Sequence, residues 1–161
     1  MAHHLWLLRH GEAEPHDARP DAERRLTPRG EDQARSAGRA MRALELRFQF
    51  VFTSPKVRAR DTALLACEAL GVEPVEHQAL ADGFDAADAR ELLGAGGQDG
   101  RILVVGHNPD FVQVIHDITG AQVELKKGGL AGLRVDGTRG ELLALLRPRE
   151  LDRLGALLTS T

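Results

Sequence analysis

The stretch Leu7-Leu8-Arg9-His10-Gly11 ends an apolar run with an arginine and a histidine side by side. A second apolar run, Ile102-Leu103-Val104-Val105, ends in the same way on Gly106-His107. A third closes at Phe52-Thr53-Ser54-Pro55, and Arg58 follows one turn later. Such short apolar runs are typical of parallel strands covered on both faces, and ligands bind beyond the carboxyl ends of these strands. Two arginines and two histidines at that edge therefore predict a pocket for a phosphoryl group.

The rest of the chain alternates between strand and helix patterns. Thr27-Pro28 predicts a helix start, because threonine caps the N-terminus and proline fits the first turn. Ser54-Pro55 predicts a second start, and Gly71 the end of that helix. After Gly120 the pattern changes to strands, with a turn at Asp136-Gly137. The predicted strands are residues 4–8, 50–53, 72–75, 101–106, 123–126, 129–135 and 141–146, and the remaining predicted helices are residues 86–93, 108–118 and 150–158.

This order of elements predicts an α/β fold. Strands that alternate with helices form a mostly parallel sheet between two helix layers, and the late hairpin adds antiparallel strands at one edge. No repeat or low-complexity linker divides the chain. We therefore expect residues 1–161 to form a single three-layer α/β/α domain.

Composition and charge limit the classes of partner. A net charge of −3 gives no overall field that would recruit nucleic acid or an anionic membrane. No apolar segment approaches the roughly 20 residues needed to span a bilayer, and Met1-Ala2-His3-His4 leads directly into the first strand without a signal-peptide pattern. Cys67 is the only cysteine, which excludes an internal disulfide and a cysteine-rich zinc site. The chain is therefore predicted to be cytoplasmic.

In combination, the motifs resemble the histidine phosphatase superfamily, which has a phosphoglycerate mutase-like fold. The mark of that family is an Arg-His-Gly at the end of the first strand, here Arg9-His10-Gly11. The runs Arg25-Leu26-Thr27-Pro28-Arg29-Gly30 and Ser54-Pro55-Lys56-Val57-Arg58-Ala59-Arg60-Asp61-Thr62-Ala63 also match its pattern. The short length and residues 102–109 are similar to the compact branch typified by the SixA phosphohistidine phosphatases.

The resemblance implies a phosphate pocket of Arg9, His10, Arg58 and His107, with His10 as the phosphorylated nucleophile. The chemistry of phosphoryl transfer agrees with these roles. A nucleophilic histidine must be neutral at one nitrogen, and arginine forks suit phosphate oxygens bidentately. His107, if protonated, adds a third donor, and Gly11 lets the backbone approach the phosphate. Because fixed positive charge supplies most of the catalysis, the scheme requires no metal and no other cofactor.

The choice of substrate depends on whether the site can protonate the group that leaves from phosphorus. The mutase and phosphoester branches carry an asparagine six residues after the nucleophile, where this chain has His16. They also use a carboxylic acid to protonate an alkoxide leaving group. Glu12, Glu14, Asp82 and Asp85 are the candidates for that acid, and the sequence does not choose among them. Phosphohistidine lessens the need for an acid, because imidazole leaves far more readily than an alkoxide.

Three functions are compatible with these residues. The first is hydrolysis of phosphohistidine on a protein, and the second is hydrolysis of a small phosphoester. The third is a non-catalytic module that binds phosphorylated partners, although the presence of all four pocket residues argues against it. The length argues against a mutase, which needs room to enclose a phosphorylated sugar acid. Lys126-Lys127 is read as a solvated strand end, with a basic lip that attracts phosphate as the alternative.

Overall fold

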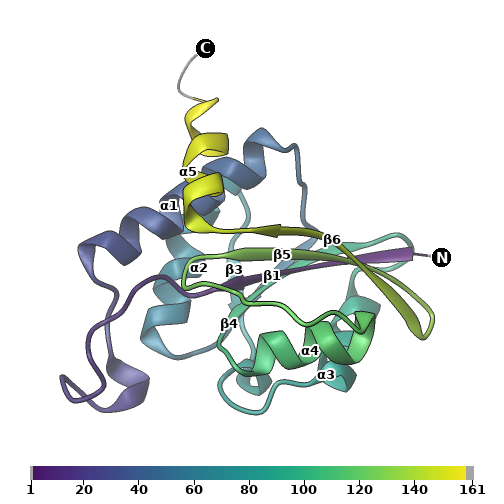
Figure 1. Ribbon diagram of the computed structural model, residues 1–161, viewed down its shortest axis with the longest axis horizontal. Helices are drawn as coiled ribbons and strands as arrows, with labels where there is room; N and C mark the ends of the chain where they lie inside the picture. The colour runs from purple at the N-terminus through teal and green to yellow at the C-terminus, as the bar shows by residue number, and fades with distance from the viewer. Residues whose placement is uncertain (1, 159–161) are drawn as a thin grey trace.

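The protein is described by a computed structural model over residues 2–158. Its centre is a six-stranded sheet in the order β3-β2-β4-β1-β5-β6 (Figure 1). Strands β1 to β4 run parallel to one another, whereas β5 and β6 form an antiparallel hairpin beside β1. The predicted α/β fold, with its antiparallel edge, is confirmed. The strands are β1 (Ala2–Arg9), β2 (Phe50–Thr53), β3 (Pro74–Glu76), β4 (Arg101–Gly106), β5 (Leu130–Asp136) and β6 (Arg139–Leu146).

Helices cover both faces of the sheet (Figure 1). Helices α1, α2 and α5 pack on one face, and α3 and α4 on the other, so the predicted three layers are confirmed. Two short 3-10 helices, η1 and η2, lie in the connections. The bounds are α1 (Pro28–Ala43), α2 (Val57–Leu70), α3 (Ala86–Ala95), α4 (Asp110–Thr119), α5 (Pro148–Ala156), η1 (Asp21–Glu23) and η2 (Gln78–Leu80).

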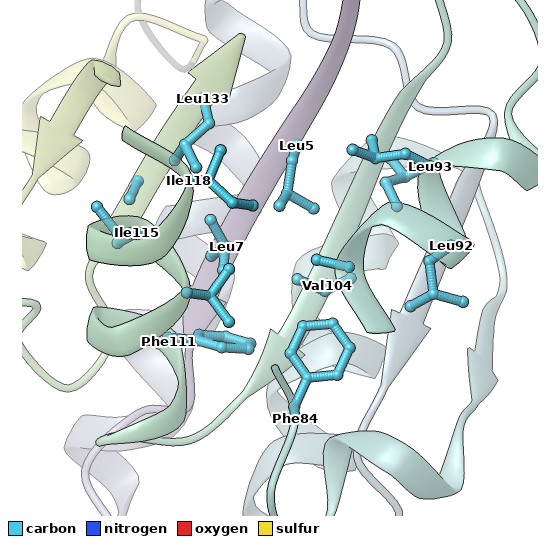
Figure 2. Packing of buried hydrophobic residues seen from close by; sticks show 14 of the residues in the cluster. Leu5, Leu7, Phe84, Leu92, Leu93, Val104, Phe111, Ile115, Ile118 and Leu133 are labelled. Carbon is cyan, nitrogen blue, oxygen red and sulfur yellow. The ribbon is translucent and has the colours of Figure 1, made fainter. Parts of the chain in front are cut away.

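Strand β1 illustrates how the sheet is buried on both faces. Leu5 and Leu7 join the cluster beneath α3 and α4, which Figure 2 shows around Phe111. Trp6 and Leu8 join the cluster beneath α1, α2 and α5. Since each fully buried leucine contributes roughly 1.5–3 kcal/mol, this strand is firmly held. The strand therefore presents its carboxyl end as a fixed point.

The helix ends follow two of the three sequence signals. The Thr27 hydroxyl accepts a bond from Gly30 N at 3.1 Å, which confirms the predicted start of α1. Gly71 ends α2 with a φ of 69°, as predicted. The start of α2 was placed too early at Ser54-Pro55, because the helix begins at Val57. Ser54 instead forms a turn in which its hydroxyl accepts from Lys56 N at 3.2 Å.

The prediction of a strand at residues 123–126 is wrong. The carbonyl oxygen of Leu125 accepts from Arg9 Nη1 at 2.9 Å and from Asn108 Nδ2 at 3.0 Å, so side chains occupy it in place of a neighbouring strand. The segment is a loop in which Leu125 is buried while Glu124 and Lys126 are exposed, and its hydrogen bonds lead to the carboxyl edge of the sheet. Among the helices of residues 2–158, none has the length and apolar character needed to cross a membrane.

Register brings the three predicted strand ends together. Arg9 of β1 lies opposite Gly106 of β4, and Thr53 of β2 lies opposite Val105. The residue that directly follows each strand is His10 after β1, Ser54 after β2 and His107 after β4. His10 N donates to Gly106 O at 3.1 Å, and Ser54 N donates to Val105 O at 3.0 Å. The parallel pairing therefore places both histidines at one edge, as predicted.

Candidate active site

His10 is buried and has a defined tautomer. Its Nδ1 lies 2.7 Å from the carbonyl oxygen of Gly11, and this oxygen can only accept, so Nδ1 carries the proton. The other ring nitrogen, Nε2, then keeps a lone pair. Burial is the main cause that lowers the pKa of His10 from its ordinary 6.5 to about 3; the bond to Gly11 opposes this shift, and the nearby His107 and Arg58 add to it. The ring is neutral at physiological pH, as a nitrogen nucleophile requires.

His107 lies beside His10, with their ring centroids 5.3 Å apart. Its Nε2 is 2.8 Å from the Ser54 hydroxyl, which already accepts from Lys56 N. The hydroxyl proton is thus free to point at Nε2, and this assignment leaves the proton of the imidazole on Nδ1. Nδ1 has no partner among the described residues. Burial, together with Arg58 and Lys56, lowers the pKa of His107 to about 3. His107 is therefore a neutral donor, whereas the sequence suggested a protonated one.

The two arginines approach the histidines from different elements. Arg9, at the end of β1, is fixed by its bond to Leu125 O. Arg58, in the first turn of α2, donates from Nη1 to Asp21 O at 2.7 Å and from Nη2 to Asp21 Oδ2 at 3.3 Å. The Nε atoms of both arginines are buried without a partner among residues 2–158. Burial lowers the pKa of each guanidinium, although arginine stays charged at neutral pH.

All four predicted site residues line one cavity of about 170 Å³. A buried threonine ties Arg58 to the residue that follows His10: the Thr62 hydroxyl accepts from Gly11 N at 3.1 Å and donates to Arg58 O at 2.7 Å. Gly11 also has a packing role, which the sequence did not indicate. A Cβ at that position would lie 2.5 Å from the carbonyl oxygen of Gly30, so glycine is needed for close packing against α1.

The cavity also contains residues that the sequence did not indicate. Asp21 and Arg24, from the irregular segment between β1 and α1, line it together with His16 and Lys127. Arg24 Nη2 lies 3.1 Å from Asp21 Oδ1, and Lys56 Nζ lies 2.9 Å from Asp21 Oδ2. Lys56, Arg58 and Arg24 together hold the pKa of Asp21 far below its usual range. Arg24 directly precedes the matched run that begins at Arg25, and that position was its only sequence signal.

Comparison with known proteins identifies the family. Residues 5–91 match the model of the histidine phosphatase superfamily, branch 1. An uncharacterised protein of Picosynechococcus sp. is 34% identical, over 91% of this chain and 98% of that protein. The chain belongs to the histidine phosphatase superfamily. A 2,3-bisphosphoglycerate-dependent phosphoglycerate mutase of Parvibaculum lavamentivorans is 35% identical, over 58% of this chain and 51% of the mutase. The family predicted from the motifs is confirmed.

Solved structures show the same compact fold. The protein histidine phosphatase SixA in complex with tungstate superposes with a TM-score of 0.83 and 21% identity, covering 92% of this chain and 99% of SixA. Phosphoserine phosphatase of Entamoeba histolytica, in complex with 3-phosphoglyceric acid, superposes with a TM-score of 0.73 and 17% identity, covering 92% and 98% of the two chains. Membership of the family supports phosphatase activity for this chain, and the solved structures show its fold.

None of the four carboxylates proposed as an acid lines the cavity. Glu12 accepts from the Thr27 hydroxyl at 2.7 Å, and Glu14 accepts from Arg25 N at 2.8 Å. The other two also have structural partners: the Asp82 carboxylate is 3.1 Å from Lys56 Nζ, and the Asp85 carboxylate caps α3. The partners of these four side chains also lie outside the lining of the cavity.

Neither a cluster of metal-binding side chains nor a reactive thiol is present in the described part of the chain. Within residues 2–158, no group of three histidine, cysteine, aspartate or glutamate side chains is arranged to hold a metal ion. Cys67 lies in the core against α1 and α2, and burial raises the pKa of its thiol to about 11. This thiol is therefore inert near neutral pH.

The two buried histidines predict that the folded protein loses stability in acid. Between pH 6.5 and about 3 the unfolded chain binds protons at His10 and His107, whereas the folded protein does not. The free energy of unfolding should therefore fall as the pH drops below 6.5, by up to roughly 1.4 kcal/mol per pH unit for each histidine. Urea unfolding between pH 8 and pH 5 measures this slope.

A matched pair of variants tests the assignment of the slope. His107→Asn removes one buried histidine and should reduce the pH dependence of unfolding. His116→Asn changes an exposed histidine on α4 and should leave the dependence unchanged. An unaltered slope in His107→Asn would show that other groups cause the acid lability.

Proposed function

We propose that the protein hydrolyses phosphohistidine on a phosphorylated protein, through a phosphoryl group held transiently on His10. In the first step His10 Nε2 attacks phosphorus, and the bond from phosphorus to the substrate imidazole nitrogen breaks. The substrate imidazole leaves as the neutral base when its other nitrogen already carries a proton. Arg9, Arg58 and Arg24 stabilise the charge on the equatorial oxygens, and His107 donates from Nδ1.

In the second step a water molecule attacks the phosphorus on His10. The phosphorus–Nε2 bond breaks, inorganic phosphate leaves, and His10 returns to its neutral form. The bond from Nδ1 to Gly11 O holds the ring in one orientation and one tautomer through both steps. Because Nδ1 keeps its proton, the phosphorylated ring is positively charged. This charge assists the breaking of the phosphorus–Nε2 bond, since the ring is released as a neutral imidazole.

One observation carries the choice of substrate. Among the described residues, Asp21 is the only carboxylate that lines the catalytic cavity, and three cations keep it ionised. A carboxylate so strongly held in its charged form is a poor acid. An alkoxide leaving group needs a proton from such an acid, whereas the imidazole of phosphohistidine does not. The cavity therefore suits a phosphorus–nitrogen bond better than an ordinary phosphoester.

A substrate panel tests the proposal. We expect hydrolysis of a phosphohistidine protein at a kcat/KM at least about a hundredfold above that of an alkyl phosphate. Phosphoserine and an alkyl phosphate serve as the small phosphoesters, and release of inorganic phosphate is the measurement. Turnover of the alkyl phosphate at an equal or higher kcat/KM would favour a small phosphoester as substrate. Tight binding of phosphohistidine without any turnover would favour the non-catalytic binding module.

His16 favours the small phosphoester as the second candidate. It lines the cavity and is exposed, and an imidazolium can donate the proton that an alkoxide requires. In that case His16→Gln should slow alkyl phosphate hydrolysis and spare an aryl phosphate, whose phenolate leaves without protonation. With phosphohistidine as the substrate, His16→Gln should have little effect.

Catalysis should persist in excess EDTA. The proposed reaction relies on guanidinium groups for the charge stabilisation that a divalent ion supplies in metal-dependent phosphatases. We expect kcat/KM to stay within about twofold of its value without chelator. Loss of activity in EDTA, with recovery on addition of one divalent ion, would contradict the role given to Arg9 and Arg58.

A further inference from the structure

A second, larger cavity adjoins the catalytic one. Its volume is about 510 Å³, against about 170 Å³ for the catalytic cavity, and Arg9 and Lys127 line both. Glu12 and Glu124 are its only acidic lining residues among the described part of the chain. Six cationic side chains line it: Arg9, Arg29, Lys126, Lys127, Arg147 and Arg149. The chain as a whole carries a net charge of −3, so this positive charge is local.

Several of these cations are not neutralised within the protein. Lys126 is paired with Glu124, and the Arg147 fork is held by Glu150 through two bonds of 2.9 Å. Arg149 is exposed, and its Nε lies 3.7 Å from the same Glu150 carboxylate. Arg29 and Lys127 are exposed and make no ion pair with any residue in the range 2–158. Two exposed cations thus remain available beside the catalytic cavity.

One loop borders both cavities, because Lys126 and Lys127 line the larger one and Lys127 also lines the catalytic one. Gly128 N donates to His10 O at 2.8 Å, and the carbonyl of the buried Leu125 accepts from Arg9. Gly128 has a φ of 76° and packs against Gln33, so its backbone has little freedom to move. The lysine that precedes it, Lys127, is therefore held at the junction of the cavities. The alternative reading of Lys126-Lys127 as a basic lip fits this placement, and the solvated strand end does not.

Two helices add to the positive potential. Arg29 is the second residue of α1, Arg149 is the second residue of α5, and these helices pack against each other (Figure 1). The N-terminus of a helix carries a partial positive charge that favours anions. Both cations therefore reinforce a field that the backbone already provides.

We infer that this cavity docks a carboxylate-rich segment next to the phosphohistidine of the substrate protein. The inference rests on the proposed function and extends it from the reacting group to the surrounding chain. A second phosphate of a small molecule fits less well, because phosphate prefers converging arginine forks and the Arg147 fork is occupied by Glu150. The available cations are exposed side chains on separate elements, which suit several carboxylates spread along a peptide.

Charge reversal beyond the catalytic cavity tests the inference. Arg29 and Arg149 line only the larger cavity, so the test variant is Arg29→Glu/Arg149→Glu. Glutamate is favourable in the first turn of a helix, so these substitutions should leave α1 and α5 folded. The control is Arg47→Glu/Arg139→Glu, which makes the same change in net charge on exposed residues near the opposite end of the sheet.

The substrates are two twelve-residue phosphohistidine peptides, one with aspartates beside the histidine and one with serines, together with phosphoramidate. For the aspartate peptide we expect the test variant to raise KM about tenfold, with kcat unchanged. The serine peptide and phosphoramidate should stay within about twofold. Added salt should shrink the advantage of the aspartate peptide, because it screens exposed charges.

Other outcomes would overturn the docking site. These are an unchanged KM for the aspartate peptide, an equal loss in the control variant, or a parallel loss for phosphoramidate. A small bisphosphate that loses affinity while the aspartate peptide does not would assign the cavity to a small molecule. A single-stranded RNA that binds more tightly than the peptide, with the same sensitivity to charge reversal, would assign it to nucleic acid.

A binding measurement separates this inference from the proposed function. Fluorescence anisotropy with the unphosphorylated aspartate peptide requires no turnover. If the wild-type protein hydrolyses neither peptide, the proposed function fails, and the docking site is then judged by anisotropy alone. Weaker binding to the test variant than to the control supports the site, and equal binding to both overturns it.

Discussion

Replacement of His10 by alanine is expected to abolish turnover while the fold stays intact. His10 is a neutral ring whose Nε2 keeps a lone pair, and its loss would remove the atom that is proposed to accept the phosphoryl group. We expect kcat/KM to fall by a factor on the order of 10⁴ or more. Release of inorganic phosphate from a phosphohistidine protein is the measurement.

Trapping of the intermediate makes this prediction specific. With labelled substrate and a rapid quench that avoids acid, wild-type protein should retain phosphate on a histidine, and His10→Ala should not. His116→Ala, which changes an exposed histidine on α4, should behave as the wild type. Circular dichroism at neutral pH checks that His10→Ala is folded. Turnover by this variant at the wild-type rate would refute the phosphohistidine mechanism.

The strand ends show why much of the site was predictable. Apolar runs that end in Arg9-His10 and Gly106-His107 fix both the sheet and the edge at which these side chains lie. Parallel neighbours end at the same edge, so a linear pattern was enough to predict that the two histidines meet. The same periodicity located α1 and its Thr27 cap within one residue. Local sequence patterns were therefore enough to predict the layers of the fold and four of the residues that line the cavity.

The segment between β1 and α1 shows where sequence reasoning ends. Residues 12–27 have little regular structure beyond η1, and their position depends on distant partners. Asp21 is held by Lys56 and Arg58, which lie more than thirty positions later in the chain. Such long-range ion pairs leave no periodic trace in the sequence. Asp21 and Arg24 were therefore missed, although both line the catalytic cavity.

The start of α2 and the loop at residues 123–126 were mispredicted for a related reason. Ser54 carries the usual signal of a helix cap, but its hydroxyl is used by His107 at 2.8 Å. Leu125 lies in a strand-like run, but its carbonyl is used by Arg9 and Asn108. In both places the contacts of the catalytic cavity override a local preference. Departures of this kind are expected near functional sites.

Arg58→Ala should lower kcat/KM by a factor on the order of 10²–10³, which corresponds to roughly 3–4 kcal/mol of transition-state stabilisation. The guanidinium lines the catalytic cavity, and its Nε has no partner within residues 2–158, so its charge is placed to stabilise a phosphoryl group there. Arg58→Lys should recover only part of the loss, because an ammonium keeps the charge but lacks the planar fork. Steady-state kinetics with a phosphohistidine protein give these values.

The bonds from Arg58 to Asp21 require a control that separates chemistry from positioning. Asp21→Asn weakens the ion pairs that hold η1 and keeps the Arg58 guanidinium in place. If Arg58 acts on the phosphoryl group, Asp21→Asn should cost about tenfold or less and leave most of the activity. Thermal unfolding of Arg58→Ala should shift by only about 2–4 °C, because Asp21 is half exposed and keeps Lys56 and Arg24 as partners. Equal losses in Asp21→Asn and Arg58→Ala, or an Arg58→Ala protein that is inactive only because it is unfolded, would make Arg58 a scaffold residue that supports η1.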